Sequence, residues 1–170
     1  MSLYFEKITE KIAHELLPIW QDIEVTQYTY VKNIQNVEDA RTKISRYLSY
    51  QHGLLGPFVV KDNNKVIGLA AGMSPEDQPS VSEIFFHFEK ASWRKGYGTQ
   101  AVNFLLNEGF NNHSLTEIQA QAVTENEASW RLLEKNGFLH KQLRKNAFQN
   151  EKDVYFYSIT YEEYRNRADL

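Results

Sequence analysis

The feature that most constrains the fold is a glycine loop that joins an apolar strand to a helix. The run Val81–Phe88 is apolar and aromatic, which is typical of a strand. Gly96-Tyr97-Gly98 follows, and then come apolar residues at helical spacing: Ala101, Val102, Leu105 and Leu106. Glycines let main-chain N–H groups approach a ligand closely, and a helix N-terminus leaves unpaired donors and a partial positive charge. The segment therefore predicts a phosphate site; the alternative is a plain strand-to-helix turn.

The rest of the pattern predicts strands and helices around one sheet. Strands are expected at residues 3–8, 58–61, 65–71, 81–88, 115–123, 138–143 and 153–159, and helices after Thr9, Asn36, Gly98 and Asn126. Residues 62–64 predict a hairpin turn, Asp39 is in capping-box position after Asn36, and Gly137 is expected at the left-handed cap of the last of these helices. We expect Pro18 to interrupt the first helix, Gly53 to stop the second, and residues 161–170 to form a solvated end. One central crossover between hairpins favours an α/β or α+β fold with a mixed, only partly parallel sheet, in a single domain over residues 1–170.

Composition excludes several classes of function. The chain has 0 cysteines, so disulfide, thiolate and zinc-thiolate chemistry are excluded. Its net charge of -3 provides no field for binding nucleic acid or an anionic membrane surface. The first 20 residues are punctuated by charges rather than forming a signal-peptide stretch, so we expect a cytoplasmic protein. The histidines show no metal-ligand spacing, so no metal site is predicted.

Known phosphate loops restrict what the glycine segment can hold. A Walker loop requires a lysine before its Ser or Thr, and Gly98-Thr99 lacks that lysine. The dinucleotide fingerprint is matched by Gly96, Gly98 and Ala101, with Glu125 at a suitable distance for a ribose contact. However, only about 70 residues follow, too few for the rest of a doubly wound sheet and a substrate domain. A dinucleotide-dependent oxidoreductase therefore stays as a minor alternative.

Two segments resemble the GNAT superfamily of N-acetyltransferases. The loop WRKGYGTQA, which begins at Trp93, resembles the family's coenzyme A pyrophosphate loop, Arg/Gln-x-x-Gly-x-Gly/Ala. Trp93 replaces the usual Arg or Gln, a variant common in the branch of ribosomal-protein N-terminal alanine acetyltransferases. The segment NEASWRLLEKNGF, which begins at Asn126, resembles the family's Asn-x-x-Ser helix and its Leu-Glu-Lys-x-Gly-Phe end. The resemblance is strong over residues 82–159 and weak before them.

This resemblance implies a fold, a cosubstrate and several contacts. The implied GNAT fold has a mixed, mostly antiparallel sheet of about seven strands flanked by about four helices. Acetyl-CoA is the implied cosubstrate. Its pyrophosphate would lie on the loop formed by Arg94, Lys95, Gly96, Tyr97, Gly98 and Thr99. Its pantetheine arm would pair with the main chain of Phe86, His87 and Phe88, and would pass beside Asn126 and Ser129.

Candidate catalytic residues come from three segments. Glu83 lies in an apolar strand and is a candidate base, directly or through water; the alternative is a sheet-edge glutamate paired with an arginine. His87 shares its face of the strand, either in an acceptor cavity or as an ordinary half-buried histidine. Ser129 is a candidate donor to the leaving thiolate, or packs only, whereas Asn126 is equally well read as a helix N-cap. Tyr155 is a possible acid near the sulfur, as is Tyr157.

We therefore predict an N-acetyltransferase that moves acetyl from acetyl-CoA to a primary amine by direct attack on the thioester. The acceptor is a protein N-terminus or a small-molecule amine, and the aromatic residues of the first third either line its pocket or pack in the core. A domain that binds acyl-CoA without turnover is the alternative from another class. The oligomeric state is undetermined, and a homodimer is left open.

Overall fold

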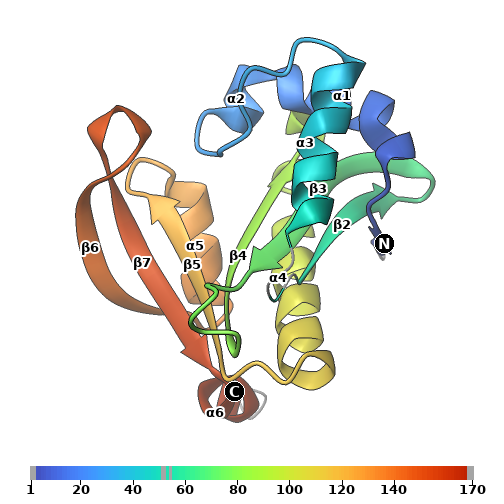
Figure 1. Ribbon diagram of the computed structural model, residues 1–170. Helices are drawn as coiled ribbons and strands as arrows, with labels where there is room; N and C mark the ends of the chain where they lie inside the picture. The colour runs from blue at the N-terminus through green and yellow to red at the C-terminus, as the bar shows by residue number, and fades with distance from the viewer. Residues whose placement is uncertain (1–2, 51–52, 54, 168–170) are drawn as a thin grey trace.

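The computed structural model describes residues 3–50, 53 and 55–167, and its chain forms a seven-stranded sheet (Figure 1). The strand order is β1-β2-β3-β4-β5-β7-β6. The strands are Tyr4–Lys7 (β1), Leu55–Asp62 (β2), Lys65–Met73 (β3), Val81–Phe88 (β4), Glu117–Val123 (β5), Leu139–Phe148 (β6) and Lys152–Thr160 (β7). Only β4 and β5 are parallel neighbours in this sheet; the other pairs are antiparallel. The prediction of a mixed, mostly antiparallel sheet is confirmed.

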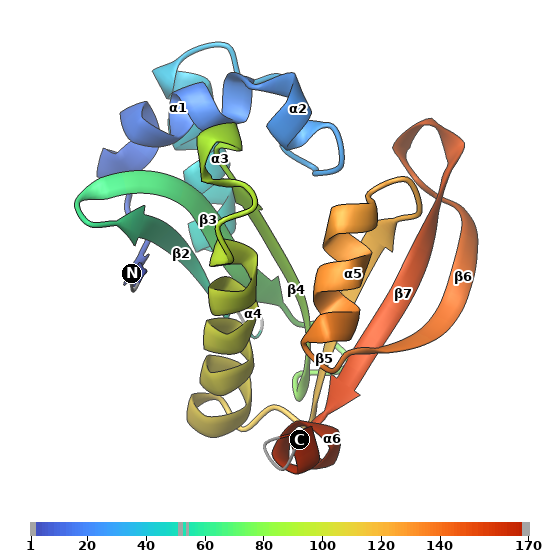
Figure 2. The ribbon, with the colours of Figure 1, turned by 180° about the vertical axis from the view of Figure 1, so that it is seen from behind.

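Helices cover the two faces of this sheet. They are Ala13–Gln21 (α1), Ile23–Thr26 (α2), Val37–Ser49 (α3), Tyr97–Asn107 (α4), Glu127–Lys135 (α5) and Tyr161–Arg167 (α6). Figures 1 and 2 show α1 and α3 on one face and α4 and α5 on the other. Each face has its own apolar cluster: Leu16, Ile44 and Leu69 are buried in the first, and Leu105, Ile118 and Leu133 in the second. No helix in the described part of the chain has the length and apolarity needed to cross a lipid bilayer.

Several local predictions are confirmed. The β2–β3 hairpin turns at Asn63, whose φ of 54° is one that asparagine tolerates. Asn36 and Asp39 form the expected capping box at the start of α3. Gly137 follows α5 with a φ of +86°, the left-handed conformation expected there.

The structure corrects two expectations. Pro18 lies inside α1, because its neighbours Leu16 and Ile19 are buried and their packing outweighs the hydrogen bond that proline removes. The second predicted helix, α3, ends at Ser49, before Gly53. The predicted solvated end is confirmed over residues 161–167, which form helix α6 with no buried residue, although Tyr164 packs against Phe110 with ring centroids 5.0 Å apart.

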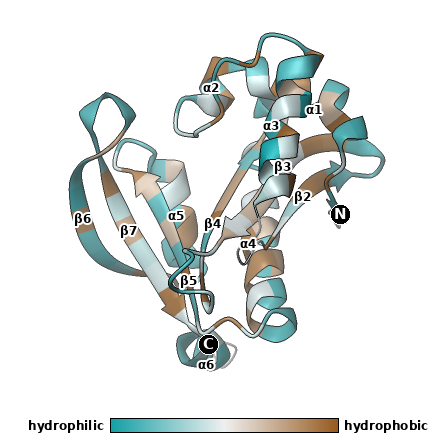
Figure 3. Cartoon of the chain, viewed as in Figure 1, coloured by the Kyte–Doolittle hydropathy of each residue, from teal (hydrophilic) through white to brown (hydrophobic). Residues whose placement is uncertain are grey.

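Strand β6 is also longer than predicted, and it continues to Phe148. It is an edge strand with mostly exposed side chains, so its sequence lacks the apolar alternation that marks a half-buried strand. Figure 3 shows this contrast, with β6 mostly hydrophilic and β4 largely hydrophobic. Composition alone does not distinguish such an edge strand from a loop.

We expect Gly68→Ala to destabilise the fold strongly. Gly68 lies in β3 beside β4, and an added Cβ would meet the His87 carbonyl oxygen at 2.2 Å and the Phe88 Cα at 3.0 Å. Because these are main-chain atoms of a central strand, relief requires the sheet to shift, which we expect to lower the free energy of unfolding by about 2–4 kcal/mol. Urea denaturation measures this loss. Gly98→Ala is the control, since its Cβ would meet only the flexible end of Leu132; equal losses in both variants would contradict the prediction.

Candidate functional site

The parallel pair β4 and β5 separates after a short contact. Their register runs from Val81↔Glu117 to Glu83↔Gln119. Beyond this point β4 stays paired with β3 as far as Phe88, and β5 stays paired with β7. Figures 1 and 2 show the two strands diverging. Within the described residues, the edge of β4 that faces β5 therefore has no strand partner after Glu83.

The direction of the main-chain N–H and C=O groups alternates along β4 and shows which residues face this open edge. The Glu89 N–H donates to the Ile67 carbonyl of β3 at 2.7 Å. Because alternate residues of a strand point to opposite sides, the main-chain groups of His87 also face β3, whereas those of Phe86 and Phe88 face the open edge. The Trp93 indole N–H donates to the Phe88 carbonyl at 3.0 Å. The edge at Phe86 is thus available to an extended ligand.

The glycine loop forms the N-terminus of α4 beside this edge. Gly96 is the N-cap residue with a φ of 78°, and no side chain caps the helix there. An added Cβ at Gly96 would meet no atom within 4 Å. Arg94 and Lys95 are exposed next to it, whereas Tyr97 is buried and donates from its hydroxyl to Asp62 Oδ2 at 2.6 Å. The loop thus presents uncapped helix donors and two cations to solvent, as an anion site requires.

Two candidate residues, Asn126 and Ser129, lie at the start of α5, on the same face of the sheet as α4. Asn126 Oδ1 accepts from the Ser129 N–H at 3.4 Å, so the N-cap interpretation of Asn126 is confirmed. Ser129 is half-buried, and Tyr155 of β7 packs edge-on against Trp130 with ring centroids 6.0 Å apart. Among the described residues, no protein group hydrogen-bonds either the Ser129 or the Tyr155 hydroxyl. Tyr157, in contrast, donates to Glu134 Oε1 at 2.9 Å.

Glu83 lies on the opposite face of β4. Gln121 Nε2 donates to Glu83 Oε1 and Oε2 at 3.1 and 3.0 Å, so a neutral amide holds the carboxylate in place instead of the arginine that the alternative requires. Glu83 is half-buried. The carboxylate candidate and the hydroxyl candidates thus lie on opposite faces of the sheet at the opening between β4 and β5. A ligand in that opening would be reached from both faces.

His87 has its side chain in the core. Its Nε2 accepts from the Trp20 indole N–H at 2.8 Å, and the residue is 7% exposed. An indole nitrogen only donates, so the imidazole is neutral with its proton on Nδ1. Burial, assisted by the nearby Lys43 ammonium, lowers the pKa of His87 to about 4. Of the two interpretations of His87, the ordinary histidine packed in the protein therefore describes its side chain. Its main chain pairs with β3.

This burial predicts an acid-sensitive stability. The pKa of His87 is lowered from 6.5 to about 4 in the folded protein, so between these values the unfolded chain binds the proton first. We expect the free energy of unfolding to fall by about 2 kcal/mol from pH 7.5 to pH 5 through this residue. Urea denaturation at the two pH values tests this. His87→Gln retains an acceptor for Trp20, and its pH-dependent loss should be smaller by that amount; an unchanged loss would contradict the assignment.

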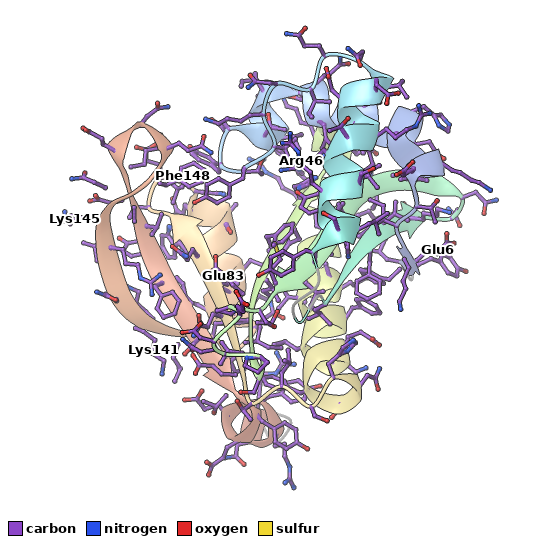
Figure 4. All side chains as sticks on the ribbon, in the orientation of Figure 1. Glu6, Arg46, Glu83, Lys141, Lys145 and Phe148 are labelled. Atoms are coloured by element: carbon purple, nitrogen blue, oxygen red, sulfur yellow. The ribbon has the colours of Figure 1, made fainter. Side chains whose placement is uncertain are left out.

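On the α3 side of the sheet, aromatic side chains lie beside a cavity. Burial and the Glu83 carboxylate raise the pKa of the Tyr30 phenol. The Tyr30 ring packs against Phe148 at 5.1 Å between centroids. Phe148, Trp20 and Tyr28 in turn line a cavity of about 740 Å³. Figure 4 labels Glu83 and Phe148 in this region.

Comparison with known proteins identifies the family. The family model described as "Acetyltransferase (GNAT) domain" matches residues 2–139. The chain belongs to the GNAT acetyltransferase family. Two N-acetyltransferases named as uncharacterised agree with this: YoaA of Bacillus subtilis (strain 168), 29% identical over 92% of each chain, and p20 of Bacillus licheniformis, 30% identical over 96% of this chain and 98% of its own. The match also includes the first third, where the motif resemblance is weak.

Solved structures share the GNAT fold with this chain. A GNAT-family acetyltransferase from Bacillus anthracis has a TM-score of 0.81 at 24% identity and covers 95% of this chain and 96% of its own. Spermidine N-acetyltransferase from Vibrio cholerae in complex with CoA and spermine has a TM-score of 0.85 at 17% identity, with 97% and 99% covered. RimL, a ribosomal L7/L12 alpha-N-protein acetyltransferase in complex with coenzyme A, has a TM-score of 0.85 at 16% identity, with 94% of each chain covered. At these identities the likeness establishes the fold.

Two residues of this candidate site lie outside the sequence-based expectations. Gln121 donates to Glu83 from the neighbouring strand, and its alternation with the buried Ala120 and Ala122 is the sequence signal of its direction. Phe148 contacts Tyr30 from the end of β6, more than 100 residues away in sequence, and no local pattern indicates that contact.

Proposed function

We propose that this chain transfers the acetyl group of acetyl-CoA to a primary amine, which belongs to a protein N-terminus or a small molecule. The observation that carries the proposal is the unpaired edge of β4 after Glu83, next to the uncapped N-terminus of α4. An extended arm can add to a strand edge, and a pyrophosphate fits a helix N-terminus. Arg94, Lys95 and the main chain of residues 96–99 would hold that pyrophosphate.

The arm would lie along Phe86 and Phe88 and pass the start of α5 at Asn126 and Ser129. The main-chain N–H and C=O groups of Phe86 face the open edge, which supports this course. Those of His87 face β3, so His87 would help to hold β4 in the sheet and would not contact the arm through its main chain. When bound, acetyl-CoA supplies a thioester that an amine can attack directly. No covalent link to the protein is needed.

Four side chains have proposed roles in this transfer. The Glu83 carboxylate accepts the proton that the amine must lose, directly or through water, while Gln121 fixes its orientation. The Ser129 and Tyr155 hydroxyls are free to donate a hydrogen bond to the departing thiolate. Base and donors lie on opposite faces of the sheet at the same opening, an arrangement that suits amine entry from the α3 side.

A ligand-induced thermal shift tests the cosubstrate. A ligand at 100 times its dissociation constant stabilises the protein by about 2.7 kcal/mol, which corresponds to an expected rise in Tm of several degrees. We expect acetyl-CoA and CoA to produce this rise, and NAD and ATP to produce none. A rise with NAD alone would establish the oxidoreductase alternative. Binding of acetyl-CoA without acetylation of any peptide or amine would favour the non-catalytic alternative.

A further inference from the structure

Three features on the acceptor side indicate what kind of amine this site accepts. The first is continuity between the candidate base and the large cavity. The Glu83 carboxylate contributes to the raised pKa of the Tyr30 phenol, and Tyr30 packs against Phe148. Phe85, two positions beyond Glu83 on the same face of β4, packs against Tyr47 of α3 with ring centroids 5.9 Å apart. Phe148 lines the cavity of about 740 Å³ together with the chain that connects α1 to α3. An acceptor whose amine lies at Glu83 would therefore extend past the Tyr30–Phe148 pair into this cavity.

The second feature is the charge of the cavity lining. None of its lining residues is an aspartate or glutamate. Its two charged residues are Lys32 and Lys152; Lys152 pairs with Glu125, and Lys32 has no ion-pair partner among the residues that the structure describes. Carboxamides supply most of the remaining polar groups: Gln21, Gln27, Asn33, Gln35, Gln149 and Asn150. The lining thus offers hydrogen bonds and positive charge, and no carboxylate that would pair with a second cation.

The third feature is a pair of cations on α3. Lys43 Nζ donates to the Tyr30 carbonyl oxygen at 3.2 Å and lies 4.9 Å from the Tyr47 ring centroid. Burial lowers the pKa of the Lys43 ammonium, and repulsion by the nearby Arg46 guanidinium lowers it further. In the described part of the chain neither has an ion-pair partner. Figure 4 labels Arg46 on the same side of the molecule as Glu83 and Phe148.

We propose that the acceptor is a primary amine whose molecule also carries carboxylates, and that polyamines are disfavoured; this rests on the proposed acetyltransferase function. Lys43, Arg46 and Lys32 would attract the carboxylates while the amine lies at the Glu83 carboxylate. A polyamine would instead bring further positive charges toward unpaired cations, which is unfavourable at short range. Acidic peptides with a free N-terminus and free acidic amino acids share this chemistry.

Competition between matched acceptors tests the proposal on the full-length chain. The panel contains a hexapeptide with glutamates at its third to fifth positions, the same peptide with glutamines or with lysines there, free glutamate, and spermidine. We expect kcat/KM for the glutamate peptide to exceed that for the glutamine peptide by about tenfold, with the lysine peptide and spermidine lower still. A rate with free glutamate equal to that with the glutamate peptide would assign the small molecule as the acceptor type.

Substitutions on α3 locate the effect. Arg46→Gln and Lys43→Gln should each lower the glutamate-to-glutamine ratio by about threefold to fivefold, and Arg46→Glu should invert it. The matched control is Arg41→Gln on the same helix, because Arg41 is already paired with Glu38 and its substitution should leave the ratio unchanged.

The outcomes separate this inference from the proposed function. If no amine is acetylated although the protein is folded, the proposed function fails. If acetylation occurs with spermidine or the lysine peptide preferred, or if the Arg46 and Lys43 variants keep the wild-type ratio, the function stands and the anionic-acceptor inference is overturned.

Discussion

Glu83→Gln is expected to lower kcat by about 10²- to 10³-fold, because it removes a proton acceptor while preserving size and the hydrogen bond with Gln121. Acetyl-CoA binds on the other face of the opening in the proposed arrangement, so its dissociation constant should stay within about twofold of the wild-type value. Steady-state kinetics with a reactive amine, together with calorimetric titration of acetyl-CoA, measures both quantities.

The matched control for this variant is Glu117→Gln. Glu117 lies two positions from Gln119 on β5, is half-buried like Glu83, and accepts from Gln119 Nε2 at 3.0 Å. Loss of its charge should leave kcat nearly unchanged. If Glu83→Gln retained the full rate, or if both variants lost it equally, the assignment of Glu83 as the base would be wrong.

Gly96→Ala is expected to weaken acetyl-CoA binding by at least about tenfold, or 1.4 kcal/mol. Gly96 has a φ of +78° at the N-cap of α4, and a side chain there is strained. An added Cβ would project into open space beside the uncapped N–H groups, where the pyrophosphate is proposed to lie. Titration of both CoA and acetyl-CoA should show the same loss, because the pyrophosphate is common to both.

A control must separate the loss of CoA affinity from the effect of backbone strain alone, and Gly137→Ala is that control. Gly137 has a φ of +86° at the end of α5, and its added Cβ would meet the Arg167 side chain. We expect this variant to lose about 1 kcal/mol of stability, as Gly96→Ala does, and to retain its affinity for CoA. Equal losses of affinity in the two variants would show that strain, and not occupation of the loop, is responsible.

The elements around the cofactor side were predictable because their signals are local. The strand Val81–Phe88, the glycine turn and the following helix are contiguous in sequence, and each has its own composition or periodicity. The capping box of α3 depends on Asn36 and Asp39, which lie within one helical turn of each other. The Asn126 cap depends on Ser129 in the same way. Interactions over such short separations are nearly independent of the rest of the fold.

The acceptor side was not predictable in the same way. Glu83 is visible as a polar residue in an apolar strand, but its partner Gln121 comes from a parallel strand across a crossover helix. The burial of His87 depends on Trp20 of α1, and the place of Tyr30 depends on Phe148. These residues come together only when separate elements pack on the same sheet.

The sequence by itself determined the order of the seven strands and of helices α1, α3, α4 and α5, together with the glycine loop, because periodicity, capping and turn chemistry act between near neighbours along the chain. It did not predict the short helices α2 and α6. The tertiary structure alone decided three things: where β4 and β5 separate, which face of β4 each candidate residue occupies, and which cations of α3 lie on the Glu83 face of the sheet. The physical reason is that strand pairing and side-chain packing join residues far apart in sequence, so the register of the sheet sets which groups meet.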